Sequence, residues 1–276
     1  MCTVPEVPAA LRQTHARWEE NGRPPQEPMR WNLATWSKWM DTDLLPSQTL
    51  SIDRAGATSV AASAVDGEDA ALRAFVTAMI WGYGPIGYGG WRTQRVLNLA
   101  GHRAGALFRE VAEVAAEKGP RDAYAAMAQA PLTYLGEAFG TKYIYFCTAA
   151  VRDRHRDRTA PVLDNVVRHW FARHTGIRMS GAWSTREYFG YLDCLESWGD
   201  ELGVPSDTVE ELIFRSQVSD DGNRLWAEPA MITSDPQGEA VVALDELRAA
   251  IDVLGEDTAA RASSALTELS EIINDR

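Results

Sequence analysis

The sequence predicts an all-α protein, and three observations support this prediction. Apolar residues recur with helical spacing along most of the chain. Glycines and prolines separate these segments into about ten short helices. No segment alternates between apolar and polar residues as a strand would, apart from the short segment of residues 240–243. With 276 residues, 45% of them hydrophobic and 24% charged, the chain suits one compact multi-helix domain spanning residues 1–276.

The predicted helices follow the spacing of large apolar residues at i, i+3, i+4 and i+7. They fall within residues 33–44, 72–80, 93–99, 107–115, 124–135, 166–171, 188–202, 244–254 and 266–273. Residues 56–67 are small and polar, which predicts a mobile linker. Trp31, Trp36 and Trp39 have near-helical spacing and are expected in the core.

The charge is distributed unevenly. A net charge of −12 by itself disfavours a nucleic-acid partner. However, residues 142–178 contain eight basic side chains and three acidic ones, a local balance of +5. Residues 193–276 contain twenty acidic side chains and five arginines, a balance of −15, and predict an acidic, helical C-terminal part. The sequence therefore predicts a basic middle region that could face a polyanion.

Targeting and redox signals are sparse. The chain has no apolar run of about 18 residues and no basic start followed by an apolar segment, so we expect a cytoplasmic protein without a membrane partner. The three cysteines, Cys2, Cys147 and Cys194, are too few and too scattered for a disulfide framework. Cys147 is expected to be a buried apolar residue.

The first segment that could form part of an active site is residues 135–142, with the sequence Leu-Gly-Glu-Ala-Phe-Gly-Thr-Lys. The glycines predict a tight hairpin between two helices, with free N–H groups that bind phosphate at the start of the second helix. Lys142 is expected in the first turn of that helix, where the helix dipole disfavours a cation. A partly desolvated lysine there loses its proton more easily and becomes a nucleophile. The alternative interpretation of the same residues is an ordinary connection between two helices, with Lys142 exposed to solvent.

The second segment is residues 160–171, in which Asp164 precedes an apolar helical pattern. Asp164 is therefore predicted to cap the N-terminus of that helix. Its carboxylate could also face the lysine and stabilise positive charge that develops on a sugar. The two roles are compatible, since capping fixes the direction of the carboxylate.

The third segment, residues 81–92, is rich in glycine and aromatic residues and predicts an exposed, shaped loop. Aromatic rings displayed on such a backbone can stack on a base or a sugar, and Arg92 can reach a phosphate. A turn whose aromatic side chains fold back into the core is the alternative. The aromatic residues in question are Trp81, Tyr83, Tyr88 and Trp91.

Taken in order, the three segments resemble the helix-hairpin-helix DNA glycosylases, and within them the 8-oxoguanine DNA glycosylase branch. The hairpin of that branch ends in Gly-x-Lys, and an aspartate follows about twenty residues later; here Lys142 and Asp164 are 22 residues apart. The resemblance covers residues 70–178. Gly140 occupies one of the family's two hairpin glycine positions, whereas the other holds Ala138, with Gly136 further back. No segment matches the family's N-terminal sheet domain.

The resemblance implies that the protein bends double-stranded DNA, rotates a modified or damaged nucleotide out of the duplex and excises its base. Lys142 would be the nucleophile and Asp164 the assisting carboxylate, without a metal or organic cofactor. The implied DNA contacts are Gly136, Ala138, Gly140, Thr141 and Arg92. The implied base pocket or probe loop contains Trp81, Tyr83, Tyr88 and Trp91.

The substrate and biological role are open at this level. The resemblance fits antiviral defence against phage DNA that carries a modified base such as glucosylated hydroxymethylcytosine, and it fits repair of 8-oxoguanine. Base release can occur with or without cleavage of the strand. Two alternatives belong to other classes of protein. One is a catalytically inactive protein that binds modified DNA, and the other is an all-helical protein-interaction domain. The sequence identifies no protein partner.

Overall fold

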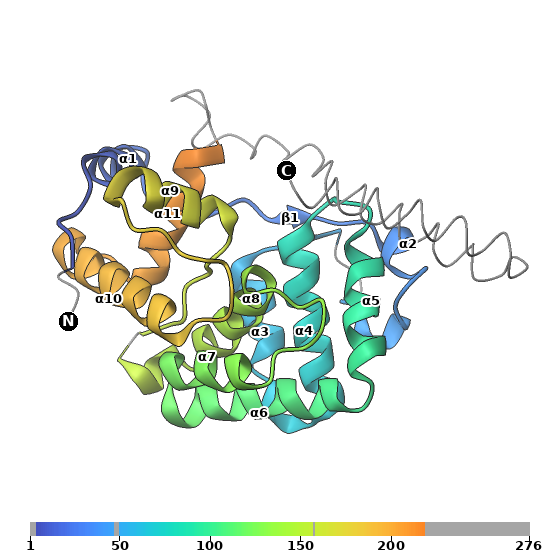
Figure 1. The fold of residues 1–276 in the computed structure, drawn as a ribbon. Helices are drawn as coiled ribbons and strands as arrows, with labels where there is room; N and C mark the ends of the chain where they lie inside the picture. Colours follow the sequence, from blue (N-terminus) through green and yellow to red (C-terminus); the bar gives the residue numbers. More distant parts are fainter. Residues whose placement is uncertain (1–3, 47–49, 157, 219–276) are drawn as a thin grey trace, which may run out of the picture. The chain divides into compact units, whose positions relative to one another are not determined.

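A computed structural model describes residues 4–46, 50–156 and 158–218 of the chain. Within these residues the protein is mostly helical, as the sequence predicts (Figure 1). The helices are α1 (Ala9–Glu20), α2 (Leu33–Trp36), α3 (Arg54–Ala61), α4 (Glu68–Tyr83), α5 (Gly89–Ala100), α6 (Arg103–Lys118), α7 (Pro120–Gln129), α8 (Glu137–Ala149), α9 (Asn165–Thr175), α10 (Thr185–Leu202) and α11 (Ser206–Val218). Short 3-10 helices are η1 (Thr42–Leu44), η2 (Ala64–Asp66) and η3 (Arg152–His155). The predicted helices within 244–254 and 266–273, and most of the acidic part from residue 193, lie outside the described residues.

Helix α8 is the centre of the described part of the chain. It packs against α3, α4, α6 and α7, and nearly all of its residues are buried (Figure 1). A helix that is apolar on every side is stable only when other elements surround it. The segment from Tyr143 to Cys147 supplies this apolar surface, and burial of each large side chain in it contributes about 1.5–3 kcal/mol relative to exposure.

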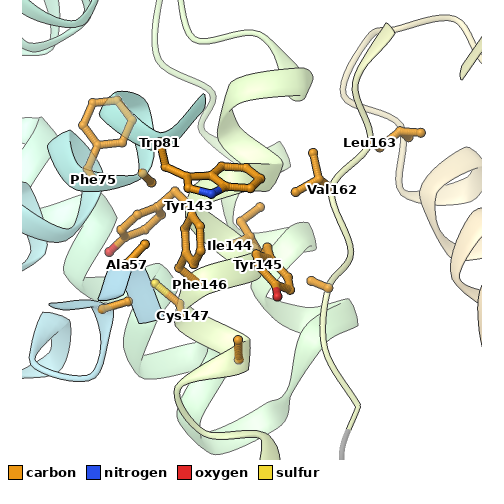
Figure 2. Packing of buried hydrophobic residues seen from close by; sticks show 14 of the residues in the cluster. Ala57, Phe75, Trp81, Tyr143, Ile144, Tyr145, Phe146, Cys147, Val162 and Leu163 are labelled. Carbon is orange, nitrogen blue, oxygen red and sulfur yellow. The ribbon is translucent and has the colours of Figure 1, made fainter. Parts of the chain in front are cut away.

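The core around α8 joins segments that are far apart in the sequence. Figure 2 shows Ala57 of α3, Trp81 of α4 and Val162 of the extended segment before α9 on the side of α8, and Leu163 on the same extended segment. The ring of Trp81 meets Phe146 edge to face, with centroids 5.1 Å apart. These contacts set the position of α4 and of the segment before α9 relative to α8, and both carry residues of the site described below.

Two expectations from the sequence are wrong, one about a mobile linker and one about a single helix. Residues 56–67 are not a mobile linker: α3 and η2 form there, because Asp53 caps α3 by accepting a hydrogen bond from the Gly56 N–H. Small residues such as Ala57, Ala61 and Ala64 are buried and let these elements approach α4 and α8 closely. The predicted helix within residues 33–44 divides into α2 and η1.

The glycine-rich segment 81–92 is also not an extended loop. Trp81 and Tyr83 belong to the last turn of α4, and Trp91 and Arg92 belong to the first turn of α5. Only residues 84–88 connect the two helices, and Gly84 ends α4 with a φ of 55°, a value that favours glycine. Trp31 and Trp36 are buried as predicted, and Trp39 is partly buried.

The described residues contain one small sheet, in which β1 (Met29–Arg30) pairs antiparallel with β2 (Ser51–Ile52). Two strands of two residues each form a local link beside α4 and do not make a sheet domain. Among the described helices, none has both the length and the apolar character that crossing a membrane requires.

Candidate active site

Lys142 lies within α8 and not at a hairpin. Helix α7 ends at Gln129, and Pro131 follows in the connection, residues 130–136. Helix α8 begins at Glu137, directly after the extended Gly136. Lys142 is consequently in the second turn, and the expectation of a first-turn position is wrong. The side chain is nevertheless buried, with 6% of the residue exposed.

The structure brings Lys142 and Asp164 together. Lys142 Nζ lies 3.4 Å from Asp164 Oδ2 and donates a second hydrogen bond to the Ala138 carbonyl oxygen at 3.2 Å. Asp164 Oδ1 accepts the N–H of Val167 at 3.1 Å, so Asp164 caps α9 as the sequence predicts. One oxygen of the carboxylate is held by the helix terminus while the other faces the amine.

Gly82 of α4 makes room for the lysine. A Cβ atom at this position would lie 2.6 Å from Lys142 Cδ and 3.2 Å from Phe139 Cε1. Phe139 lies beside both Gly82 and the lysine, with its ring centroid 5.0 Å from Nζ. The stem of Lys142 therefore packs closely against α4 at Gly82, next to the Phe139 ring. Sequence analysis missed this role, although a glycine inside an apolar helical pattern is a signal of close approach.

A buried carboxylate, Glu210 of α11, lies near this pair. Burial raises the pKa of Glu210 to about 7, the Arg54 guanidinium lowers it, and the nearby charge of Asp164 raises it further. Glu210 Oε2 accepts a hydrogen bond from Arg54 Nη2 at 2.9 Å. Arg54 in turn lies over the rings of Trp81 and Tyr145, at 5.1 and 4.9 Å from their centroids. No local pattern around residue 210 indicates this placement.

A second buried network holds the elements of the site together. Glu137, the first residue of α8, accepts hydrogen bonds from Arg168 Nη2 of α9 at 2.7 Å and from the Tyr124 hydroxyl of α7. The Tyr124 oxygen also accepts the N–H of Ser184 at 3.0 Å, just before α10. Burial raises the pKa of Glu137, against the lowering effects of its hydrogen bonds to Tyr124 and Arg168. The start of α8, which carries Lys142, is thus linked to α9, which Asp164 caps.

Of the five residues expected to contact DNA, the four from residue 136 to residue 141 have different surroundings. Gly136 is exposed before α8, and Ala138 is partly exposed on its first turn. Gly140 is buried, donates its N–H to the Gly136 carbonyl at 3.0 Å and faces Trp183, whose ring a Cβ would approach to 2.3 Å. Thr141 is buried and accepts the N–H of Leu163 at 3.1 Å. The glycine at 140 and the threonine at 141 therefore serve packing inside the protein.

The aromatic residues of the 81–92 segment divide into two groups. Trp81 and Tyr83 are buried, and Tyr83 stacks on Phe139 with centroids 4.1 Å apart. Burial raises the pKa of Tyr83, and the nearby Arg92 lowers it. Tyr88 meets Tyr83 edge to face at 5.7 Å and is partly exposed, as are Trp91 and Arg92. The alternative of rings that fold into the core thus holds for Trp81 and Tyr83.

The basic middle region is partly neutralised inside the protein. Arg152 pairs with Asp207 at 2.7 Å, and Arg168 pairs with Glu137. The arginines of this region that are exposed are Arg154, Arg156, Arg158, Arg173 and Arg178. In the described parts of the chain, no three His, Cys, Asp or Glu side chains form a group that could hold a metal ion.

The described fold is all-α apart from one small sheet, and in it a lysine on α8 faces the aspartate that caps α9. The comparison with protein families gives the class, which is that of the DNA glycosylases. Residues 22–214, more than half of the chain, match the family described as "Putative 8-oxoguanine DNA glycosylase OGG-like protein", and the chain belongs to this family. No curated protein and no solved structure matches the chain. DNA is the partner that membership of this family implies.

Proposed function

We propose that the protein excises a modified or damaged base from double-stranded DNA, with Lys142 as nucleophile and Asp164 as the assisting carboxylate. The observation that carries the proposal is the contact of 3.4 Å between Lys142 Nζ and Asp164 Oδ2. The pair is well oriented, because the helix cap directs the carboxylate and Gly82 and Phe139 confine the lysine stem. Such preorganisation favours attack on a sugar carbon placed beside the amine.

The reaction follows from the chemistry of the pair. The target nucleotide rotates out of the duplex, and the neutral amine of Lys142 forms a bond to C1′ of the sugar. The bond from C1′ to the base breaks, and its electron pair leaves with the base, which takes up a proton. The lysine nitrogen then loses a proton, and the C1′–O4′ bond opens with its electron pair on O4′, which takes up a proton and becomes a hydroxyl. The product is a protonated Schiff base between the lysine nitrogen and C1′. Asp164 Oδ2 stabilises the positive charge on the sugar and is the carboxylate oxygen in contact with the amine that can accept the lysine proton.

The Schiff base then has two fates. Water hydrolyses it and restores the amine, or elimination of the 3′ phosphate cleaves the strand first. The first alternative makes the protein a simple glycosylase, and the second adds a lyase activity. Neither route needs a metal ion or organic cofactor, since the lysine nitrogen and the carboxylate supply both the electron pair and the proton acceptor.

DNA contacts in this proposal come from the exposed residues near the start of α8 and α5. Gly136 and Ala138 lie at the N-terminus of α8, where backbone N–H groups and the helix dipole suit a phosphate. Arg92, Tyr88 and Trp91 are partly exposed around the start of α5. In this proposal the buried Trp81 and Tyr83 form the wall of the base pocket on the α4 side. The exposed arginines within residues 154–178 add positive potential that attracts the DNA backbone.

Two substrate classes remain within the proposal. Family membership favours 8-oxoguanine and with it DNA repair. The aromatic character of residues 81–92 suits a larger modified base, such as glucosylated hydroxymethylcytosine in phage DNA, and with it antiviral defence. In either role we expect the protein to act on DNA in the cytoplasm.

The test is trapping of the Schiff base with borohydride on duplexes that contain 8-oxoguanine, uracil, hydroxymethylcytosine, glucosylated hydroxymethylcytosine or an abasic site. We expect a covalent adduct with the wild type that Lys142→Gln abolishes. Lys118→Gln is the matched control, because Lys118 is exposed at the end of α6 and is one of only three lysines in the chain. Base release by Lys142→Gln at the wild-type rate would refute the lysine mechanism, and the duplex that reacts identifies the substrate class.

A further inference from the structure

A second group of side chains, of which only Trp91 belongs to the predicted site, lies where the connection between α7 and α8 meets α5. Tyr134 is 42% exposed, and its φ is 67°. Arg95 Nη2 donates a hydrogen bond to the Tyr134 hydroxyl at 2.9 Å. The Arg95 guanidinium lies 4.5 Å from the centroid of the Tyr134 ring and 5.4 Å from that of Trp91. We call these three side chains the aromatic–arginine stack.

The backbone of Tyr134 is unusual for its residue type. A bulky residue with positive φ is strained, and such strain persists only where the surroundings maintain it. Here the Leu135 N–H bonds to the Leu132 carbonyl at 3.0 Å, and Arg95 holds the hydroxyl. The ring is therefore presented at the surface in a defined position, although an apolar ring gains free energy by burial.

The charge around the stack points to an anionic occupant. Residues 70–109, which include all of α5, contain five arginines and no Asp or Glu. Residues 123–136, which carry Tyr134, contain no acidic residue either. Of the five arginines, Arg95 belongs to the stack and Arg92 lies on the same helix, α5, so this surface carries local positive charge although the chain has a net charge of −12. Aromatic rings with guanidinium groups suit a ligand that has both flat bases and phosphates.

The stack flanks the candidate active site. Tyr134 is eight residues before Lys142, and α8 begins three residues after Tyr134. From Lys142, a continuous set of ring contacts leads back to α5: Lys142 lies over Phe139, Phe139 stacks on Tyr83, and Tyr83 meets Tyr88 at the start of α5. Trp91 follows in the first turn of α5 and Arg95 in the second.

We infer that Tyr134 is a DNA-stacking residue that enters the duplex beside the extruded nucleotide, with Arg95 holding its ring in place and Trp91 supporting Arg95. This inference deepens the proposed function and rests on it. A ring that occupies the space between base pairs compensates for the stacking lost when a nucleotide leaves the duplex. The occupant is duplex DNA, and the contribution of Tyr134 is to binding and extrusion, not to the reaction at C1′.

The experiment compares Tyr134→Ala and Tyr134→Phe with the wild type on two substrates. The first is a duplex with the target base and 2-aminopurine beside it, on which affinity and unstacking are measured by fluorescence. The second is a single-stranded oligonucleotide with an abasic site, on which borohydride trapping reports the lysine chemistry alone. Val65→Ala is the control, because Val65 is an exposed apolar residue in η2, next to the start of α4 and away from its site-bearing end.

We expect Tyr134→Ala to lower the affinity for the duplex roughly 5- to 100-fold and to reduce the 2-aminopurine signal. We expect Tyr134→Phe, which keeps the ring but loses the hydrogen bond to Arg95, to lie between the wild type and Tyr134→Ala. Trapping on the single strand should be unchanged in both variants. Wild-type duplex affinity in Tyr134→Ala, or an equal loss of trapping on the single strand, would overturn the inference. Absence of trapping in the wild type would instead overturn the proposed function.

Discussion

Replacement of Gly82 by alanine tests the geometry of the lysine most directly. The added Cβ would lie 2.6 Å from Lys142 Cδ and 3.0 Å from Cε, closer than carbon atoms approach in proteins. The lysine stem is flexible and can move, whereas the backbone of α4 is held within the core. We therefore expect the amine to move by about 1 Å while the fold is kept, and a displacement of this size costs about 100-fold in rate.

The expected change in stability is small. Alanine is favoured over glycine in a helix by about 1 kcal/mol, whereas crowding in a packed region costs about 1–3 kcal/mol. The net effect of Gly82→Ala is thus a loss of about 0–2 kcal/mol, which thermal unfolding measures. The rate is measured as base excision in a single turnover, with enzyme in excess over DNA.

Gly190→Ala is the matched control for this prediction. Gly190 lies in α10, is exposed, and has no atom within 4 Å of the position of an added Cβ. This variant should gain about 1 kcal/mol of stability and excise the base at the wild-type rate. An unchanged excision rate in Gly82→Ala would refute the argument that Gly82 positions Lys142.

Three further predictions concern the carboxylates around the site. Asp164→Asn should keep the cap of α9 and the wild-type melting temperature but lose base excision, whereas Asp164→Ala should lose excision and also about 1 kcal/mol of stability in denaturant unfolding. Arg168→Ala leaves Glu137 buried without its cation and should cost about 3–5 kcal/mol, which calorimetry can measure; a loss below 1 kcal/mol would contradict the role of this ion pair. The raised pKa of Glu210 means that the folded protein binds its proton more tightly than the unfolded chain does. This contribution to stability is therefore fully present below about pH 4.5, where the carboxyl is protonated in both states, and is lost as the pH rises through about 7. The melting-temperature difference between the wild type and Glu210→Gln should change over that interval and level off above it, and a constant difference from pH 4.5 to 8 would count against the buried placement.

Patterns between near neighbours in the chain account for the correct predictions. Asp164 followed by an apolar periodic segment predicts a cap, and the Asp164 side chain forms that cap with Val167. The spacing of apolar residues likewise predicts α4, α6, α9 and α10. Caps and helical faces depend on contacts between residues three or four positions apart, which a sequence displays directly.

The errors arise where distant packing decides the outcome. Gly140 suggests a turn, yet its missing side chain makes room for the ring of Trp183, 43 residues later in the chain. The glycines around Tyr83 suggest an exposed loop, but the ring of Phe139 gives Tyr83 a buried stacking partner. A glycine required by a turn and one required by close packing look the same in a single sequence.

The sequence by itself determined the all-α class and the helix that Asp164 caps, because periodicity and capping are local properties. It made Lys142 and Asp164 the candidate site residues through the resemblance to the glycosylases. Only the tertiary structure decided that Lys142 Nζ and Asp164 Oδ2 lie 3.4 Å apart, that Gly82 confines the lysine, and that Tyr134 stands exposed beside Arg95. Each of these depends on how α4, α5, α8 and the segment before α9 pack together. Many weak contacts across the whole core together decide how the helices are arranged. These contacts join residues that are far apart in the chain, so no short segment of the sequence reveals them.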